Sequence, residues 1–325
     1  FNCLELTTPE ISLLHREIGE FFAEAINQSI KRAALKNKDV HLIGSHGQTI
    51  FHHSGMENIK PTSFQIGDGD VIAEITRIPV ISDFRAKDIA AGGEGAPLTP
   101  YADAILYPYT AEKKRIILNL GGVGNITVLN EDPLKITGFD TGPANGPLDR
   151  IVRKISDGKQ FQDTEGKIAL SGKVNENLLQ ELLNKDPYIK KQPPKSTGFE
   201  MYGDGFVDEL IKKHGKCDNN LLATITKFVG ISIGIAVKDF VPFQVDEIVV
   251  AGGGANNPAL IEEIQKAVLP SRVVRSDDLG VKVFAREAIA FAIFANDFLF
   301  EIPTSIPSVT GAKSPRVLGK LSLPI

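Results

Sequence analysis

The sequence predicts an α/β protein with two domains, and three observations carry this prediction. Residues 116–129 have the pattern of an apolar strand, a glycine turn and a second apolar strand. Short apolar strands that end in polar or glycine-rich turns and lead into helices recur along the rest of the chain. The length of 325 residues exceeds the size at which one hydrophobic core usually stops growing. We therefore expect two domains, each with its own core.

The first expected elements are a long helix and a short strand. Thr8 is expected to cap the helix, with Pro9 at the first helical position, and apolar residues recur at helical spacing over 11–26. A strand follows at 40–43 and ends in the polar turn 44–49. Further strands are expected near 64–66, 80–82, 136–140 and 247–250, helices over 71–75, 221–237, 259–268 and 285–300, and loops at 193–198 and 303–315.

The hairpin pattern of residues 116–129 predicts a phosphate-binding site. Glycines let backbone N–H groups approach an anion without a Cβ in the way, and Asn119 and Asn125 add polar groups on both sides of the turn. An ordinary β-hairpin whose glycines only serve the turn is the alternative. A dinucleotide fingerprint would need a helix after the glycines, whereas residues 126–129 have the pattern of a strand.

The strand that follows the hairpin ends on a carboxylate, Asp140. Residues 141–145 then lead into an amphipathic helix. A candidate base therefore lies close in sequence to the predicted phosphate site, although Asp140 could also be a surface turn residue. Asp149, one turn into the helix, is expected to be a helix-surface charge beside Arg150.

A second glycine-rich turn, at residues 252–257, joins a strand to a helix. Because a helix N-terminus favours negative charge, this turn suits the adenosine and α-phosphate of a nucleotide. It also partly fits a dinucleotide fingerprint, with Asp277 after the next strand and Asn257 in place of the third glycine. Residues 252–257 do not separate these two alternatives.

Polar side chains also follow the strands of the first part of the chain. Ligands of open α/β sheets bind outside the carboxyl ends of strands, so these side chains are expected to converge on one cleft. Arg85, followed by the glycine-rich segment 92–95, suits an anionic or polyhydroxylated ligand, although Asp83, Arg85 and Asp88 could instead form a structural ion-pair group. His52 and His53 would point to opposite faces of a strand, which disfavours a shared metal.

The composition is that of an ordinary globular protein, with a formal net charge of −4 and 42% hydrophobic residues. No nucleic-acid partner is expected, because the basic clusters are short.

Cys3 and Cys217 have neither disulfide-framework nor zinc spacing, which fits a reducing, cytoplasmic location. No run is expected to span a bilayer, and no signal peptide is expected at residues 1–15.

Taken together, these motifs resemble the anhydro-N-acetylmuramic acid kinase family of the sugar kinase, Hsp70 and actin superfamily. The resemblance implies a two-lobed actin-like ATPase fold, ribonuclease H-like, with a cleft between the lobes. It further implies a first lobe of residues 1–113 and 285–325 and a second lobe of residues 114–284. The matching segments are 45–49, 65–68, 83–85, 92–97, 119–125, 140–145, 194–198, 252–258 and 307–312.

The family's reaction uses ATP and Mg²⁺ to open 1,6-anhydro-N-acetylmuramic acid with water and to phosphorylate O6, in cell-wall recycling. By resemblance, Asp140 is the base that takes a proton from water. The implied nucleotide-binding residues are Asn119, Gly121, Gly122, Gly124, Asn125, Gly252, Gly253, Gly254 and Asn256. The implied residues for the amino sugar are His46, Gln48, Asp83, Arg85 and Asn145. A homodimer is expected from the resemblance alone.

The sequence departs from the family pattern at two places. Family members begin with a phosphate-binding hairpin that nothing before Phe1 supplies, so the chain looks N-terminally incomplete and its turnover is open. Phe199 stands where the family pattern has arginine. The alternatives are a truncated, non-catalytic sugar- or nucleotide-binding protein, a kinase for another carbohydrate, and, least favoured, a dinucleotide-dependent oxidoreductase.

Overall fold

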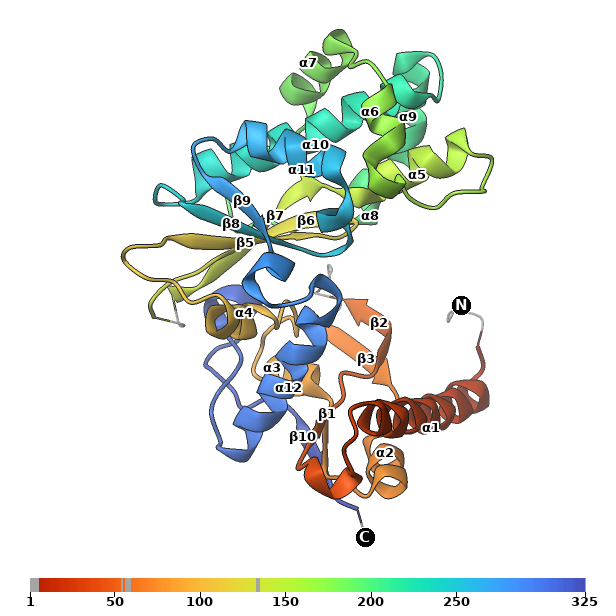
Figure 1. Cartoon of the computed structure of the whole chain (residues 1–325), viewed down its shortest axis with the longest axis vertical. Coiled ribbons are helices and arrows are strands. Elements are labelled where there is room, and N and C mark those ends of the chain that lie inside the picture. The colour runs from red at the N-terminus through yellow and green to blue at the C-terminus, as the bar shows by residue number, and fades with distance from the viewer. Residues whose placement is uncertain (1–5, 54, 56–59, 133–134, 325) are drawn as a thin grey trace. The chain divides into compact units, whose positions relative to one another are not determined.

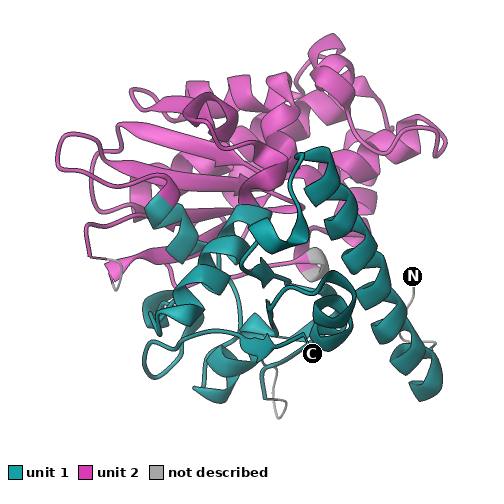
Figure 2. Ribbon diagram, turned by 60° about the horizontal axis from the view of Figure 1, so that its bottom comes forward, with its two compact units in different colours: residues 1–105, 287–325 teal, residues 106–286 magenta. Residues whose placement is uncertain are grey.

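The computed structural model describes residues 6–53, 55, 60–132 and 135–324. The chain divides into two compact units, one of residues 1–105 and 287–325 and the other of residues 106–286 (Figure 2). We call them unit 1 and unit 2. Both contain helices and sheets, which confirms the predicted α/β class.

Unit 1 contains a three-stranded sheet of order β1-β4-β10 and a separate two-stranded sheet of β2 and β3. Strand β1 pairs with β4 in parallel, β10 pairs with β4 in antiparallel fashion, and β2 and β3 are antiparallel. The strands are β1 (Ile43–Gly44), β2 (Gln48–His53), β3 (Thr62–Ile66), β4 (Val80–Ser82) and β10 (Lys320–Ser322). The helices are α1 (Thr8–Arg32), α2 (Gly69–Thr76), α3 (Phe84–Ala90), α4 (Pro100–Leu106), α12 (Arg286–Leu299) and α13 (Pro307–Thr310).

Helix α1 begins one residue earlier than the sequence pattern predicted, because Thr7 rather than Thr8 is the N-cap. The backbone N–H and the hydroxyl of Thr7 donate to Glu10 Oε2 at 2.7 and 2.6 Å. Glu10 thereby satisfies the cap residue and places a negative charge in the first helical turn, where the helix dipole favours it. The predicted Pro9 does stand in that turn.

Unit 2 is built on a five-stranded sheet of order β7-β6-β5-β8-β9. Strands β5, β6 and β7 are antiparallel neighbours, whereas β5, β8 and β9 run parallel. This mixed sheet agrees with the predicted ribonuclease H-like fold. The strands are β5 (Arg115–Leu120), β6 (Val123–Val128), β7 (Thr137–Pro143), β8 (Glu247–Ala251) and β9 (Arg272–Arg275).

The helices of unit 2 include α10 (Asn219–Phe240) and α11 (Pro258–Ala267), which lie side by side along the sheet (Figure 1). Their apolar side chains form one core with β5, β6 and β8. The remaining helices are α5 (Asn145–Ile155), α6 (Lys167–Ser171), α7 (Glu176–Lys185), α8 (Phe199–Tyr202) and α9 (Asp204–His214). Short 3₁₀ turns lie at η2 (Asn37–Asp39), η4 (Thr164–Gly166), η5 (Gly253–Asn256), η6 (Ser276–Leu279) and η7 (Val283–Ala285).

Helix α10 corrects the expectation that no run is long and apolar enough to cross a membrane. It has 22 residues and a mean hydropathy of 1.7 over its most apolar window. However, 78% of that window is buried inside the structure. Burial by α11 and the sheet accounts for its composition, because a helix that is apolar on all sides is typical of a protein core as well as of a membrane span.

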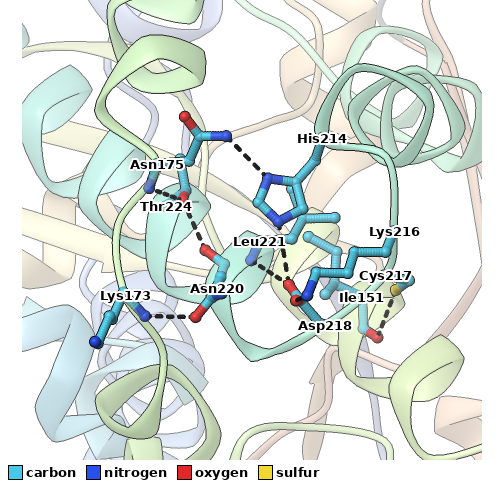
Figure 3. Close-up of polar contacts among 10 residues, drawn as sticks. All are labelled: Ile151, Lys173, Asn175, His214, Lys216, Cys217, Asp218, Asn220, Leu221 and Thr224. Carbon is cyan, nitrogen blue, oxygen red and sulfur yellow. Dashed lines mark hydrogen bonds and ion pairs between the residues drawn. The ribbon is translucent and has the colours of Figure 1, made fainter.

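A histidine-centred network joins three helices of unit 2 (Figure 3). Asn175 caps α7, because its Oδ1 accepts from the N–H of Leu178 at 3.2 Å. The Asn175 side-chain amide therefore donates to His214 Nδ1, at 3.2 Å, and Nε2 of that ring donates to Asp218 Oδ1 at 3.2 Å. Asp218 in turn caps α10. Cys217 nearby is a free thiol, while Cys3 lies outside the described residues.

Candidate active site

A polar row crosses the sheet of unit 2. Asp140 on β7 pairs with Asn125 on β6, and Asn125 pairs with Asn119 on β5. Asn119 also pairs with Ala251 of β8, immediately before the glycine turn. Residues directly opposite each other on neighbouring strands point to the same face. The register therefore brings together the two asparagines, the candidate base and the start of the second glycine turn.

The turn of the β5–β6 hairpin is anchored to the start of α5. The carbonyl oxygens of Gly121 and Gly122 accept from the N–H groups of Asn145 and Gly146, both at 2.9 Å. Because a peptide group is planar and trans, the N–H of Gly122 points opposite to the Gly121 carbonyl, away from α5. The sequence pattern predicts that such backbone amide groups hold an anion. Gly124, the third predicted glycine, is buried in β6.

The second glycine turn lies directly beside this hairpin. Gly252 has a φ of +81°, and a Cβ there would lie 2.7 Å from the carbonyl oxygen of Leu120 and 2.9 Å from Asn119 Oδ1. Asn145 lies between the two turns. Its side-chain amide donates to the Leu120 carbonyl at 2.9 Å. On the other side, its Oδ1 would lie 2.7 Å from a Cβ built on Gly254. The structure thus places Asn145 with the predicted nucleotide-binding residues.

Beyond Gly252 the chain forms the 3₁₀ turn η5 and then α11. Asn257 replaces the third fingerprint glycine because it is the N-cap of α11, with its side chain accepting from Leu260 N–H at 3.3 Å. The predicted Asn256 accepts from Arg275 Nη2 at 2.8 Å, and the same nitrogen donates to Asp277 at 2.7 Å. Sequence reasoning missed Arg275, whose position on β9 gave no signal of this contact.

Asp140 is a half-buried residue inside β7 rather than a turn residue at the surface. Its Oδ2 accepts from the N–H of Thr197 at 2.9 Å. Its backbone N–H donates to the Lys195 carbonyl at 3.1 Å, and its carbonyl accepts from the Tyr188 hydroxyl at 3.2 Å. The predicted loop at 193–198 therefore runs beside Asp140 and fixes the orientation of its carboxylate.

Asp149 differs from the expected helix-surface charge, because it is half-buried on α5. Burial raises the pKa of its carboxyl to about 6, although the charges of Arg153 and Arg150 act in the opposite direction. A raised pKa in a carboxyl group of a candidate site is compatible with a role in proton transfer, but it also follows from burial alone. We assign Asp149 no role.

In unit 1, the predicted residues His46 and Arg85 contact each other. Arg85 Nε donates to His46 Nε2 at 3.0 Å, so the ring proton is on Nδ1, which lies 3.0 Å from the Gly47 carbonyl. Arg85 Nη1 also donates to the Gly95 carbonyl at 2.6 Å. Burial, and then the charge of Arg85, lowers the pKa of His46 to about 4, which keeps the ring neutral at physiological pH.

The other predicted residues of unit 1 have separate partners. Asp83 pairs with Lys320 of β10, and Gln48 on β2 is exposed. Asp88 is fully buried and accepts from the Gly95 N–H at 2.9 Å and the Thr310 hydroxyl at 2.7 Å. Arg85 and Asp88 thus hold the same residue, Gly95, whereas Asp83 has a separate partner.

Within the described part of the chain, no group of three or more His, Cys, Asp or Glu side chains could hold a metal ion. Phe199 stands at the first position of α8, and its side chain lies outside what the structure describes.

Two α/β units, one of them carrying a glycine hairpin beside a glycine turn, agree with the actin-like ATPase fold that the motifs predicted. A sequence profile of the family described as anhydro-N-acetylmuramic acid kinase matches residues 2–323. The chain belongs to this family, which confirms the resemblance noted from its motifs.

Individual relatives agree with the family profile. The anhydro-N-acetylmuramic acid kinase of Caldanaerobacter subterraneus subsp. tengcongensis is 42% identical over 328 residues, which are 98% of this chain and 82% of the relative. That of Bacillus cereus strain G9842 is 39% identical over 99% of this chain and 86% of the relative.

Among solved structures, a ROK family glucokinase from Streptomyces griseus, in complex with glucose and AMPPNP, has a TM-score of 0.35 and 13% identity. The match covers 86% of this chain and 88% of the glucokinase.

Proposed function

We propose that this chain is an ATP-dependent kinase that opens 1,6-anhydro-N-acetylmuramic acid with water and phosphorylates O6. The products are N-acetylmuramic acid 6-phosphate and ADP, and the reaction serves cell-wall recycling in the cytoplasm. Membership of the kinase family supports the reaction class and a sugar substrate. The observation that carries the proposal within the structure is the oriented Asp140 in one row with Asn125 and Asn119 beside the glycine hairpin.

The proposed reaction has one proton acceptor, Asp140. Water forms a bond to the anomeric carbon and loses a proton to the Asp140 carboxylate. The bond between the anomeric carbon and O6 breaks, O6 forms a bond to the γ-phosphorus of ATP, and ADP leaves. The N–H of Thr197 holds one carboxylate oxygen, so the base is fixed before substrate binds.

Unit 2 is proposed to bind the nucleotide. Gly121, Gly122 and Gly124, with Asn119 and Asn125, would contact the β- and γ-phosphates. The turn of Gly252, Gly253, Gly254 and Asn256 would contact adenosine. This assignment is supported by the close approach of the two turns, which leaves no space for side chains at Gly252 or Gly254.

Mg²⁺ is proposed as the metal of the nucleotide. It binds in such sites mainly through substrate phosphates and water, with few protein ligands. When bound, Mg²⁺ neutralises phosphate charge.

Unit 1 is proposed to bind the amino sugar through His46, Gln48, Asp83 and Arg85, and Asn145 of unit 2 is proposed to contact it as well. Arg85 is the group for the lactyl carboxylate or a ring hydroxyl, because a guanidinium forms charge-assisted hydrogen bonds to anions. Its orientation by His46 and Gly95 supports this role. A homodimer is also proposed, from the family alone.

The proposed base is tested by Asp140→Asn. We expect kcat for ADP release with the anhydro sugar to fall about a hundred-fold to ten-thousand-fold, because the amide does not accept the proton. The control is Asp239→Asn, which changes an exposed aspartate of α10. Near-normal turnover of Asp140→Asn would contradict the role of Asp140. Equal turnover when N-acetylmuramic acid replaces the anhydro sugar would instead indicate a kinase for another carbohydrate.

A further inference from the structure

The segment that holds Asp140 is itself organised around a buried lysine. Lys195 is only 6% exposed, and its Nζ donates to the carbonyls of Tyr188 and Ile189, both at 3.3 Å. The carboxylate of Asp186 shapes this turn, because its Oδ1 accepts from the N–H groups of the same two residues at 2.9 and 3.0 Å. Two carbonyl oxygens therefore face the ammonium ion.

Aromatic rings complete the surroundings of the Lys195 ammonium. Its Nζ lies 4.5 Å from the ring centroid of Phe240, 4.8 Å from that of Tyr188 and 6.0 Å from that of Phe139. These distances are those of cation–π contacts. They explain how the charge is tolerated in the interior, but they do not explain why a charged residue is there, because an apolar side chain would fill the same space.

The backbone of Lys195 and its neighbours contacts Asp140 directly. The Lys195 carbonyl accepts from Asp140 N–H, the Tyr188 hydroxyl donates to the Asp140 carbonyl, and Thr197 N–H donates to the Asp140 carboxylate. The Lys195 ammonium ion thus connects residues 188–189 with residues 195–197, and both groups contact Asp140. Loss of the ammonium ion would weaken the three hydrogen bonds to Asp140.

The two carboxylates near Lys195 favour its protonated form, whereas burial and the charge of Lys191 oppose it. Burial lowers the pKa of its ammonium to about 8, while the carboxylates of Asp140 and Asp186 act to raise it and Lys191 lowers it further. On α10, Lys238 and Asp239 are exposed. A charge that costs stability and acts on the proposed base is typical of functional rather than purely structural residues.

We propose that Lys195 is a positioning residue for the reaction: its ammonium ion clamps the 188–197 segment onto Asp140 and favours the ionised carboxylate. This inference rests on the proposed function, in which Asp140 is the base. Lys195 does not contact the reacting atoms and acts only through Asp140. Its sequence position, in a proline-rich loop, gave no indication of burial.

The test compares the pH dependence of kcat/KM in two neutral variants, Lys195→Met and Lys195→Gln, with that of the wild-type chain. The acid limb of this profile reports ionisation of the essential base in the free enzyme. We expect the limb to move to higher pH by about one unit in both variants, because an opposite charge near a carboxyl shifts its titration by this order. Lys195→Arg keeps the charge and is expected to leave the limb in place.

The matched control is Lys190→Met, which removes an exposed lysine of the same segment. A purely structural role would lower the thermal midpoint and the plateau of activity without moving the limb, and that result would overturn the proposal.

The shift is also measured without turnover, from the ¹³C carboxyl resonance of Asp140 during a pH titration, assigned with Asp140→Asn. If that resonance titrates identically in wild type and Lys195→Met, the inference fails even where the proposed function holds. If Asp140→Asn is active, the proposed function fails instead.

Discussion

At the scale of single residues, His46 acts on the proposed sugar site through Arg85. The neutral ring accepts from Arg85 Nε, and this contact directs the guanidinium together with the Gly95 carbonyl. Because the pKa of His46 is about 4, protonation would occur only well below neutral pH. At such a pH the protonated His46 ring would direct an N–H at the guanidinium instead of accepting from it. Sugar binding should therefore weaken as the pH falls through about 4. From pH 6 to 8, titration of His46 should not affect sugar binding.

This role predicts different results for two substitutions of His46. His46→Leu leaves the half-buried Arg85 Nε–H without its acceptor, which costs about 1–3 kcal/mol, so the KM for the anhydro sugar should rise about ten-fold or more. His46→Gln can still accept and should raise this KM less. The KM for ATP, measured in the same assays, is the internal control. Equal effects of both substitutions would show that the ring contacts the sugar rather than orienting Arg85.

At the scale of elements, the hairpin, the start of α5 and the second glycine turn form one packed group. The Asn145 side chain links them through the Leu120 carbonyl. Gly254 has no room for a Cβ, because it would lie 2.7 Å from both Asn145 Oδ1 and Leu120 Cβ, whereas the nearest atom to a Cβ on Gly253 is 3.8 Å away. Gly253 and Gly254 are therefore a matched pair for testing this packing, because a Cβ fits at Gly253 but not at Gly254.

Gly254→Ala should lower the free energy of unfolding of the ligand-free chain by about 1–3 kcal/mol, as other over-packed sites do. Gly253→Ala should stay within about 0.5 kcal/mol of wild type. Urea unfolding followed by circular dichroism measures both. If the two variants are equally stable, the contact of Gly254 with Asn145 is not a determinant of this packing.

Much of this arrangement could be predicted from the sequence, because apolar runs and glycine turns are local signals. The hairpin at 116–129 and the strand, glycine turn and helix at 247–268 were found in this way. The Arg85–His46 contact joins residues 39 positions apart and has no local signal. Burial of Lys195 was missed because lysine usually lies at the surface, and only the folded 186–189 turn and the aromatic rings provide its environment.

At the scale of the whole molecule, the proposed nucleotide contacts belong to unit 2 and most of the proposed sugar contacts to unit 1. The proposed reaction couples hydrolysis of the anhydro bridge to phosphoryl transfer in one chain. A kinase that only phosphorylates a free hydroxyl would not incorporate water into its product.

The most direct test is mass spectrometry of the products formed from Mg-ATP and 1,6-anhydro-N-acetylmuramic acid in ¹⁸O-labelled water. We expect N-acetylmuramic acid 6-phosphate with the label on the anomeric oxygen. A short incubation, and a control with unlabelled product in the same water, distinguish this label from one gained by later exchange. A phosphorylated sugar that retains the anhydro bridge, or no phosphorylated sugar at all, would contradict the account.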